Sequence, residues 1–196
     1  MRIPTIRCNK IFEVRTGLAL ALLTCLFLPA CDIHVKKSDG GDNKNVDINT
    51  PVGGIHVENE AKAQDTGLAV YPGSRISEKT GNDEKQATVD VSVMGYGVKV
   101  VAVEYKSDDP PSKIIAFYRD QLKKYGNVLE CHSQGSDIKA DPKSRRKELS
   151  CDADSGKSIE LKVGTEGNQH VVNVDADGTG TKFALVHVNM RAGDTI

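Results

Sequence analysis

Two aspartate-rich segments carry the residue types best suited to metal chemistry in this 196-residue chain. Residues 152–156 read DADSG and residues 175–180 read DADGTG. Alternating carboxylates with a glycine can begin a calcium loop, but such loops end in a glutamate, and the corresponding position here is Val186. Tight hairpin turns also prefer aspartate and glycine. Both segments therefore favour turns over calcium sites.

The histidines show no spacing typical of a metal or catalytic site, because none are paired at i and i+4. His132 follows Cys131, but neighbouring residues in a strand point to opposite faces, so the two side chains cannot easily act together. His170 and His187 lie in segments expected to be strands, so they can share a face if those strands pair. The chain also lacks a G-x-S-x-G turn and a phosphate-binding loop. No catalytic residue, metal or cofactor is predicted.

Residues 1–30 have the three parts of a secretory signal. Four basic residues precede an apolar run over residues 17–28 (GLALALLTCLFL), and the run ends in Leu28-Pro29-Ala30-Cys31. The run is shorter than the stretch of about 20 apolar residues that spans a bilayer. An export signal is therefore expected.

Leu28, Ala30 and Cys31 resemble the lipobox of bacterial lipoprotein signal peptides. The resemblance implies cleavage before Cys31, lipid on its sulfur, and a membrane-anchored protein that faces the periplasm. Asp32 is similar to a signal that retains some lipoproteins in the inner membrane, and the choice between inner and outer membrane stays open. An uncleaved anchor helix and ordinary cleavage after Ala30 are the alternatives.

Cys131 and Cys151 are the cysteines that remain after removal of the signal and lipidation of Cys31. An even pair in an oxidising compartment favours a disulfide, and nothing here resembles a redox C-x-x-C motif. Strands near 127–133 and 147–153 would place the two residues opposite each other if they paired antiparallel. Opposite Cα atoms in such a pair lie within disulfide range.

The charge balance argues against a nucleic-acid binder, which would carry a basic excess. The whole chain has 26 basic and 27 acidic residues. Four of the basic and one of the acidic residues lie in residues 1–30, so the mature chain has a net charge of −4. Anionic headgroups are therefore not expected to attract it.

Residues 31–66 are predicted to form a lipidated stalk with a short β-hairpin. Residues 36–45 are polar and rich in Gly, Asp and Asn, residues 46–58 alternate around a Pro-Val-Gly-Gly turn, and residues 59–66 form a second polar linker. The globular part is expected to begin at Gly67 and to span residues 67–196.

In the globular part, apolar and polar residues mostly alternate as in β-strands, and one segment has the pattern of a helix. The helix is expected at residues 110–125, capped by Asp109, with a buried stripe of Ile114, Tyr118, Leu122 and Tyr125. Strands are expected near 68–71, 89–93, 98–105, 127–133, 147–153, 157–163, 169–175 and 182–190. The strand over residues 98–105 is apolar on both faces, which predicts a central position.

The predicted fold class is α+β, with a single helix packed on an antiparallel β-sheet in the order β-β-β-α-β-β-β-β-β. The helix that runs through Phe117-Tyr118 into Tyr125-Gly126 and a strand resembles a pattern in uncharacterised bacterial envelope proteins, which implies no activity. The expected function is that of a non-catalytic interaction module for an envelope partner. The alternatives are a periplasmic module that binds an apolar or lipid-like ligand between helix and sheet, and, least supported, a hydrolase.

Overall fold

The computed structural model describes residues 32–37, 44–58, 61–77, 86–93, 95–133, 144–151 and 155–191. The predicted signal peptide, Cys31, most of the polar stalk and residues 152–154 of the first aspartate-rich segment lie outside these ranges. Residues 134–143, between the two cysteines, also lie outside them. Within the described ranges, no helix is long and apolar enough to span a membrane.

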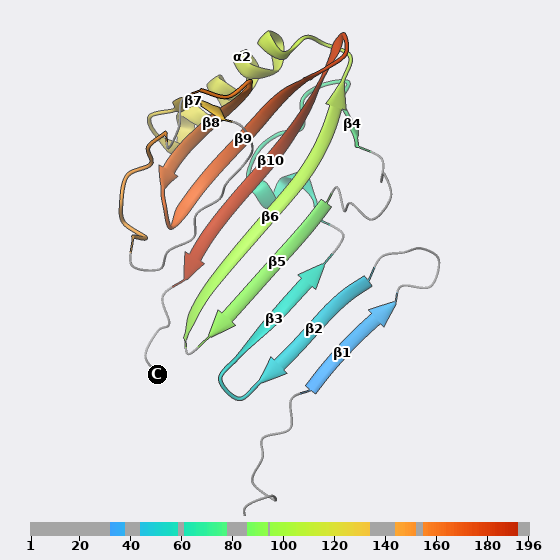
Figure 1. The fold of residues 1–196 in the computed structure, drawn as a ribbon, viewed down its shortest axis with the longest axis vertical. Helices are drawn as coiled ribbons and strands as arrows, with labels where there is room; N and C mark the ends of the chain where they lie inside the picture. The colour runs from blue at the N-terminus through green and yellow to red at the C-terminus, as the bar shows by residue number, and fades with distance from the viewer. Residues whose placement is uncertain are drawn as a thin grey trace, which may run out of the picture.

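One antiparallel sheet forms the body of the molecule, with one α-helix behind its upper part (Figure 1). The strands follow the order β1-β2-β3-β5-β6-β10-β9-β8-β7, and the short strand β4 also pairs with β6. The predicted α+β class is therefore confirmed. The strand bounds are β1 Asp32–Lys37, β2 Lys44–Thr50, β3 Gly53–Glu58, β4 Arg75–Ile76, β5 Gln86–Val93, β6 Tyr96–Ser107, β7 Leu129–Ser133, β8 Ser158–Thr165, β9 Asn168–Asp177 and β10 Gly180–Arg191.

The helix α2 spans Pro111–Leu122 and begins one residue later than the sequence suggests. Its N-cap is Pro110, and Pro111 occupies the first helical position, where an N–H would have no partner within the helix. Asp109 makes no cap; its carboxylate accepts from Lys113 Nζ at 2.7 Å and from the Tyr71 hydroxyl at 2.9 Å. These two bonds, that of Lys113 first, lower the pKa of Asp109.

The main core lies between α2 and strands β8, β9 and β10. Ile114, Tyr118 and Leu122 are fully buried, as the predicted stripe requires. The sheet residues below them are also buried and apolar, so helix and sheet meet in a filled layer. These sheet residues are Leu161, Val163, Val172, Val174, Phe183 and Leu185.

Tyr125 does not belong to the buried stripe, contrary to the sequence expectation. It lies in the 3₁₀ turn η2, Lys123–Tyr125, where the chain leaves the α-helical period. Its ring is 37% exposed, and its hydroxyl donates to the Gly67 carbonyl at 2.7 Å. The change from α to 3₁₀ geometry rotates this side chain off the helix face.

Residues 61–71, the described part of this region, form neither the predicted linker nor the predicted strand over 68–71. Ala63–Thr66 form the 3₁₀ helix η1, which packs on β6 and β10. Side chains satisfy two of the backbone donors that a strand would use: Leu68 N–H donates to Thr66 Oγ1 at 3.3 Å, and Tyr71 N–H donates to the Tyr118 hydroxyl at 3.1 Å. Burial of Leu68 then fixes the segment on the core.

The predicted strand over residues 147–153 is also wrong. In its described part only Glu148 forms a bridge, opposite Thr165. The neighbour of β7 is β8, and Cys131 lies opposite Glu160 rather than Cys151. Strand β8 contributes Leu161 and Val163 to the layer under α2, which the more polar 147–151 segment cannot do.

The hairpin of β2 and β3 continues the main sheet, because β3 pairs with β5. Ile55 lies opposite Val91, and Val57 lies opposite Val89. Strand β1 pairs with β2 and forms one edge of the sheet, while β7 forms the other. Strand β6 is central, as predicted, and joins the hairpin side to the helix side.

Candidate functional site

The apolar side chains of the sheet change face across its width. On β8 and β9 most of them point toward α2, whereas Glu160, Lys162 and Asn173 point to the other face. Val171 of β9 also points to that other face, where it is buried beside Val186 and Val188 of β10. On β5 the pattern is reversed: valines lie on the face away from α2, and Asp90 and Ser92 lie on the face of α2. Strands β6 and β10 are apolar on both faces and make the transition.

Thirteen partly exposed apolar residues form one continuous field on the face opposite α2, which we call the valine face. The pairing registers of β2, β3, β5, β6 and β10 place them all on that side. The members are Val46, Ile48, Ile55, Val57, Ala87, Val89, Val91, Val93, Tyr96, Val98, Val100, Ala102 and Ala184.

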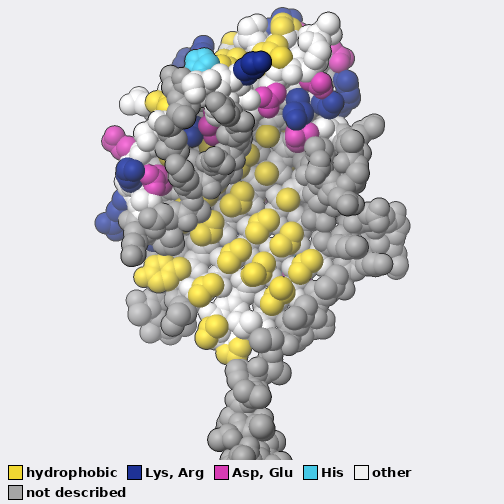
Figure 2. All heavy atoms as spheres, viewed as in Figure 1, with side chains coloured by type: hydrophobic (Ala, Val, Ile, Leu, Met, Phe, Trp, Pro, Cys, Tyr) yellow, Lys and Arg dark blue, Asp and Glu magenta, His cyan; other side chains and the backbone are white. Residues whose placement is uncertain are grey.

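Figure 2 shows the hydrophobic side chains of this face gathered across the middle and lower part of the molecule. The most exposed members lie toward one end of the strands: Ile55 is 40%, Val93 54% and Tyr96 58% exposed. The remaining ten are half-buried, since neighbouring side chains on a pleated surface shield one another. A contiguous apolar field of this kind marks an interaction site more often than scattered exposed residues do.

The reverse side of β2, β3 and β5 is polar and partly charged, whereas that of β6 and β10 belongs mainly to the core under α2. Arg191 pairs with Asp90, and His56 contacts both Asp47 and Glu58, the second at 3.0 Å between Nε2 and Oε1. Hydrogen bonds that the imidazole donates to Asp47 and then to Glu58 raise the pKa of His56. This half of the sheet therefore has one face suited to water and one that is not, the usual pattern of an antiparallel sheet that packs on something.

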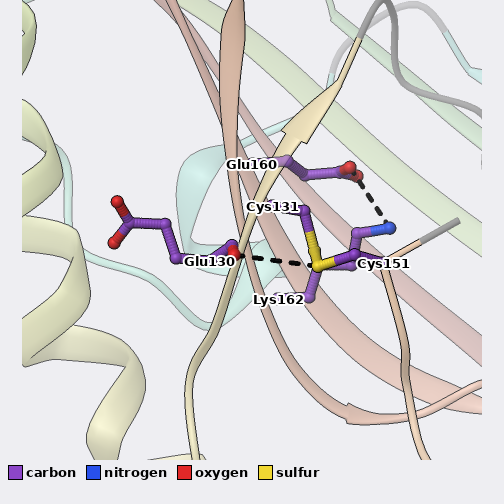
Figure 3. Close-up of a disulfide and its surroundings, with 5 residues drawn as sticks. All are labelled: Glu130, Cys131, Cys151, Glu160 and Lys162. Carbon is purple, nitrogen blue, oxygen red and sulfur yellow. Dashed lines mark hydrogen bonds and ion pairs between the residues drawn. A yellow bond between two sulfur atoms is a disulfide. The ribbon is translucent and has the colours of Figure 1, made fainter. Parts of the chain in front are cut away.

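A disulfide lies at the edge of the sheet formed by β7. Cys131 and Cys151 are bonded with a Cα–Cα distance of 5.5 Å, and Cys151 Sγ lies 3.7 Å from the Glu130 carbonyl oxygen (Figure 3). Nearby, the buried pair of Glu160 and Lys162 meets at 3.2 Å between Oε2 and Nζ. The pairing predicted for the two cysteines is thus present, although the strand register predicted to bring it about is not.

The segment from Ser144 to Cys151 is held beside the β8–β9 turn by backbone hydrogen bonds. Gly167 N–H donates to the Arg145 carbonyl at 2.9 Å, and Glu166 N–H donates to the Lys147 carbonyl at 3.0 Å. Arg145 also lines a small hollow of about 160 Å³ at the end of the valine face. The other lining residues are Val91, Val93, Tyr96, Gly97, Val98, Met190 and Arg191.

A stack of three rings lies on the opposite face, where η1 packs on the sheet. His170 is sandwiched between Tyr125, with ring centroids 3.8 Å apart, and His187, with centroids 4.4 Å apart. Burial, followed by the charges of His187 and Lys124, lowers the pKa of His170 to about 4. Burial and then the charge of Lys99 lower that of His187. The rings are neutral at pH 7, and they meet on one face as the strand pairing allows.

Polar contacts of the two imidazole rings indicate that the ring stack has a packing role. His170 Nδ1 is 2.9 Å from the Thr66 carbonyl oxygen, and His187 Nε2 is 3.0 Å from Asn168 Oδ1. Across the ranges that the structure describes, no group of three or more His, Cys, Asp or Glu side chains is arranged to hold a metal ion. The stack therefore fixes η1 on the sheet.

The second aspartate-rich segment forms a turn, as the sequence favours. Asp177 pairs with Gly180, and Gly178 has a φ of 64° between β9 and β10. The strand predicted near 89–93 is present as part of β5, but the face that Val89, Val91 and Val93 share with the hairpin was not predicted. The sequence feature that could have indicated this shared face is the period-two alternation of apolar residues, which β2 and β3 also show. No family model, curated protein or solved structure matched the chain when it was compared with them.

Proposed function

We propose that this protein is a lipid-anchored cell-envelope protein, facing the periplasm, that binds a partner through the valine face without catalysing a reaction. The observation that carries the proposal is the valine face itself. Thirteen apolar side chains share one side of five strands, three of which, β2, β3 and β5, are polar on their other side. Apolar surface removed from water contributes roughly 25 cal/mol per Å², so contact with a partner is favourable.

The anchoring part of the proposal rests on the lipobox resemblance and on its position relative to the sheet. Strand β1 begins at Asp32, the residue that follows Cys31. A lipid on Cys31 would therefore hold the edge of the sheet directly at the membrane. Two or three acyl chains on one cysteine are enough for stable anchoring.

A substitution at Cys31 tests the anchor. Cys31→Ser should leave the precursor unprocessed or move the protein out of the membrane fraction, because the proposed lipid attachment point is lost. Cys25→Ser, within the predicted signal, is the matched control and should change neither. Unchanged precursor size and fractionation of the Cys31→Ser variant would contradict the lipoprotein assignment.

Photocrosslinking in intact cells tests the interaction surface. A benzoylphenylalanine introduced at Val93 in the full chain should form protein adducts, because this side chain lies on the valine face and is exposed. The neighbouring Ser92, exposed on the charged face, is the matched control and should form few. Equal adduct yields from the two positions, or none from Val93, would count against the valine face as a binding surface.

A second candidate, binding of an apolar or lipid-like ligand, is favoured by the hollow beside Met190 and Arg145. Its volume of about 160 Å³ is below the roughly 300 Å³ at which typical ligand sites begin. The helix–sheet layer is filled, with Ile114 and Phe183 at most 1% exposed. Organic extracts of the purified protein, analysed by mass spectrometry, should contain a stoichiometric lipid only if this candidate holds.

A further inference from the structure

We propose that the partner of the valine face is a second copy of this chain, bound face to face so that two half-sheets form a β-sandwich. This inference rests on the proposed function, because it names the occupant of the same surface. Two antiparallel sheets commonly pack about 10 Å apart with apolar side chains interdigitated between them. The valine face resembles one inner surface of such a sandwich, and the described residues form no second sheet that packs against it.

The composition of the face suits sheet-on-sheet packing. Seven of its thirteen members are valines, and β5 alternates between these apolar residues and polar residues on the reverse side. Branched side chains are stiff, so two such surfaces can interlock at little cost in side-chain entropy. A two-fold axis needs only one surface that is complementary to itself, and a flat field of similar side chains meets that condition.

The size of the face suits a modest dimer. With strands about 4.8 Å apart and same-face side chains about 6.8 Å apart, each position covers roughly 33 Å² of sheet. Thirteen positions in two copies cover somewhat under roughly 1,000 Å², and the projecting Ile55, Val93 and Tyr96 add to this. A stable biological interface usually exceeds about 1,000 Å², so a dimer of this size should associate weakly in dilute solution. Anchoring both copies in one membrane would raise their effective concentration and favour the pair.

The charge distribution favours a second copy over a lipid surface. No member of the valine face is charged. Apolar surfaces that lie on membranes usually carry Lys and Arg beside them, which attract anionic headgroups. On the side of the valine face, the charged residues of β6 and β10 lie at one end of these strands and are paired, Lys106 with Asp177 and Lys182 with Glu104. Arg191, paired with Asp90, and His56, paired with Asp47, lie on the reverse face.

Two differently tagged full-length copies, produced together in intact cells, test this inference. The photocrosslinker at Val93 should give an adduct that carries both tags, whereas the crosslinker at Ser92 should not. Ile55→Glu should reduce the doubly tagged adduct about tenfold or more, since a carboxylate would be buried without a partner in the sandwich. Ile55 is 40% exposed, so the variant should still fold, and circular dichroism can verify this.

Ser92→Glu is the matched charge control, because it adds the same carboxylate on the reverse face, and its doubly tagged adduct should be unchanged. Adducts of Val93 with a different protein overturn the second copy but leave the interaction module intact. Adducts with lipid alone overturn the second copy and favour the ligand alternative. The absence of any adduct at Val93 overturns both the dimer and the proposed binding surface.

Discussion

His170 and His187 stack with only 5° between their ring planes, and both are held neutral at the junction between η1 and the sheet. Each ring approaches the other across the β9–β10 pair, where the two residues are opposite partners. Protonation of either ring would place a charge in a buried layer and against its neighbour. The junction is therefore built for neutral imidazole.

The first prediction follows from that relationship. In the folded state the pKa of His170 is about 4, whereas the unfolded chain takes up this proton near its ordinary value of 6.5. Between these values the unfolded state binds more protons, so stability should be complete above about pH 6.5 and should fall as the pH drops toward 4. Urea unfolding midpoints measured from pH 7.5 to pH 5 would show this decline.

The double variant His170→Gln/His187→Gln should have a shallower decline, and His132→Gln, on an exposed side chain, should retain the parent slope. His56 acts in the opposite direction, because its raised pKa gives stability that is lost as the pH rises. It is 42% exposed, so its contribution should be small. A double variant with the parent slope would show that the ring stack does not carry the pH dependence.

The second prediction concerns the disulfide. Cys131 and Cys151 are 20 residues apart in the sequence, and a loop of this size should stabilise the protein by about 3 kcal/mol, mainly by restricting the unfolded chain. The double variant Cys131→Ser/Cys151→Ser should lose that amount in urea unfolding and should expose residues 144–151 to proteases. Two free thiols at these positions in denatured, unreduced mature protein would refute the bond.

The third prediction compares two glycines in turns. Gly164 has a φ of 112°, and a Cβ there would lie 2.1 Å from the Asn168 carbonyl oxygen, whereas Gly178 has a φ of 64° with open space around it. Gly178→Ala should therefore cost only the strain of a left-handed residue, about 1 kcal/mol. Gly164→Ala should cost about 3 kcal/mol or more, because the clash adds to the strain. Equal losses in thermal unfolding would contradict the clash.

The fourth prediction removes one hydroxyl from each of two tyrosines. Tyr118→Phe deletes the acceptor of the Tyr71 N–H in a fully buried position and should destabilise the protein by about 1–2 kcal/mol. Tyr125→Phe removes a bond to the Gly67 carbonyl near solvent, where Lys124 Nζ also donates, and should cost less than about 0.5 kcal/mol. Denaturant unfolding of the two variants side by side would test the difference.

The sequence predicted the helix-side sheet well because its signals are local. Alternation in β8, the turn at Gly178 and the two-sided apolar pattern of β6 each depend on residues close together in the chain. The stripe of Ile114, Tyr118 and Leu122 is equally local. The exposed position of Tyr125 was not predicted, because the last turn of the helix tightens to 3₁₀ geometry.

The valine face could not be predicted in the same way, because it depends on pairing between distant segments. Alternation assigns Ile55 and Val91 to one side of their own strands but does not say that β3 pairs with β5. The same limit explains the error over residues 147–153, where Cys131 has β8 as its neighbour although its sulfur is bonded to Cys151. Disulfide partners need not be strand partners.

Because the apolar side chains change face at β6 and β10, the free energy needed to open backbone hydrogen bonds locally should differ across the sheet. Amides of β9 lie in a ladder that is covered by α2, whereas those of β2 and β3 depend on hydrogen bonds with few fully buried side chains beside them. The free energy of opening should therefore decrease from β9 toward β1 along one unbroken ladder. Binding of a partner to the valine face would reduce this difference in opening free energy. Amide hydrogen exchange in β2, β3 and β5 should therefore be slower in the bound protein than in the free chain.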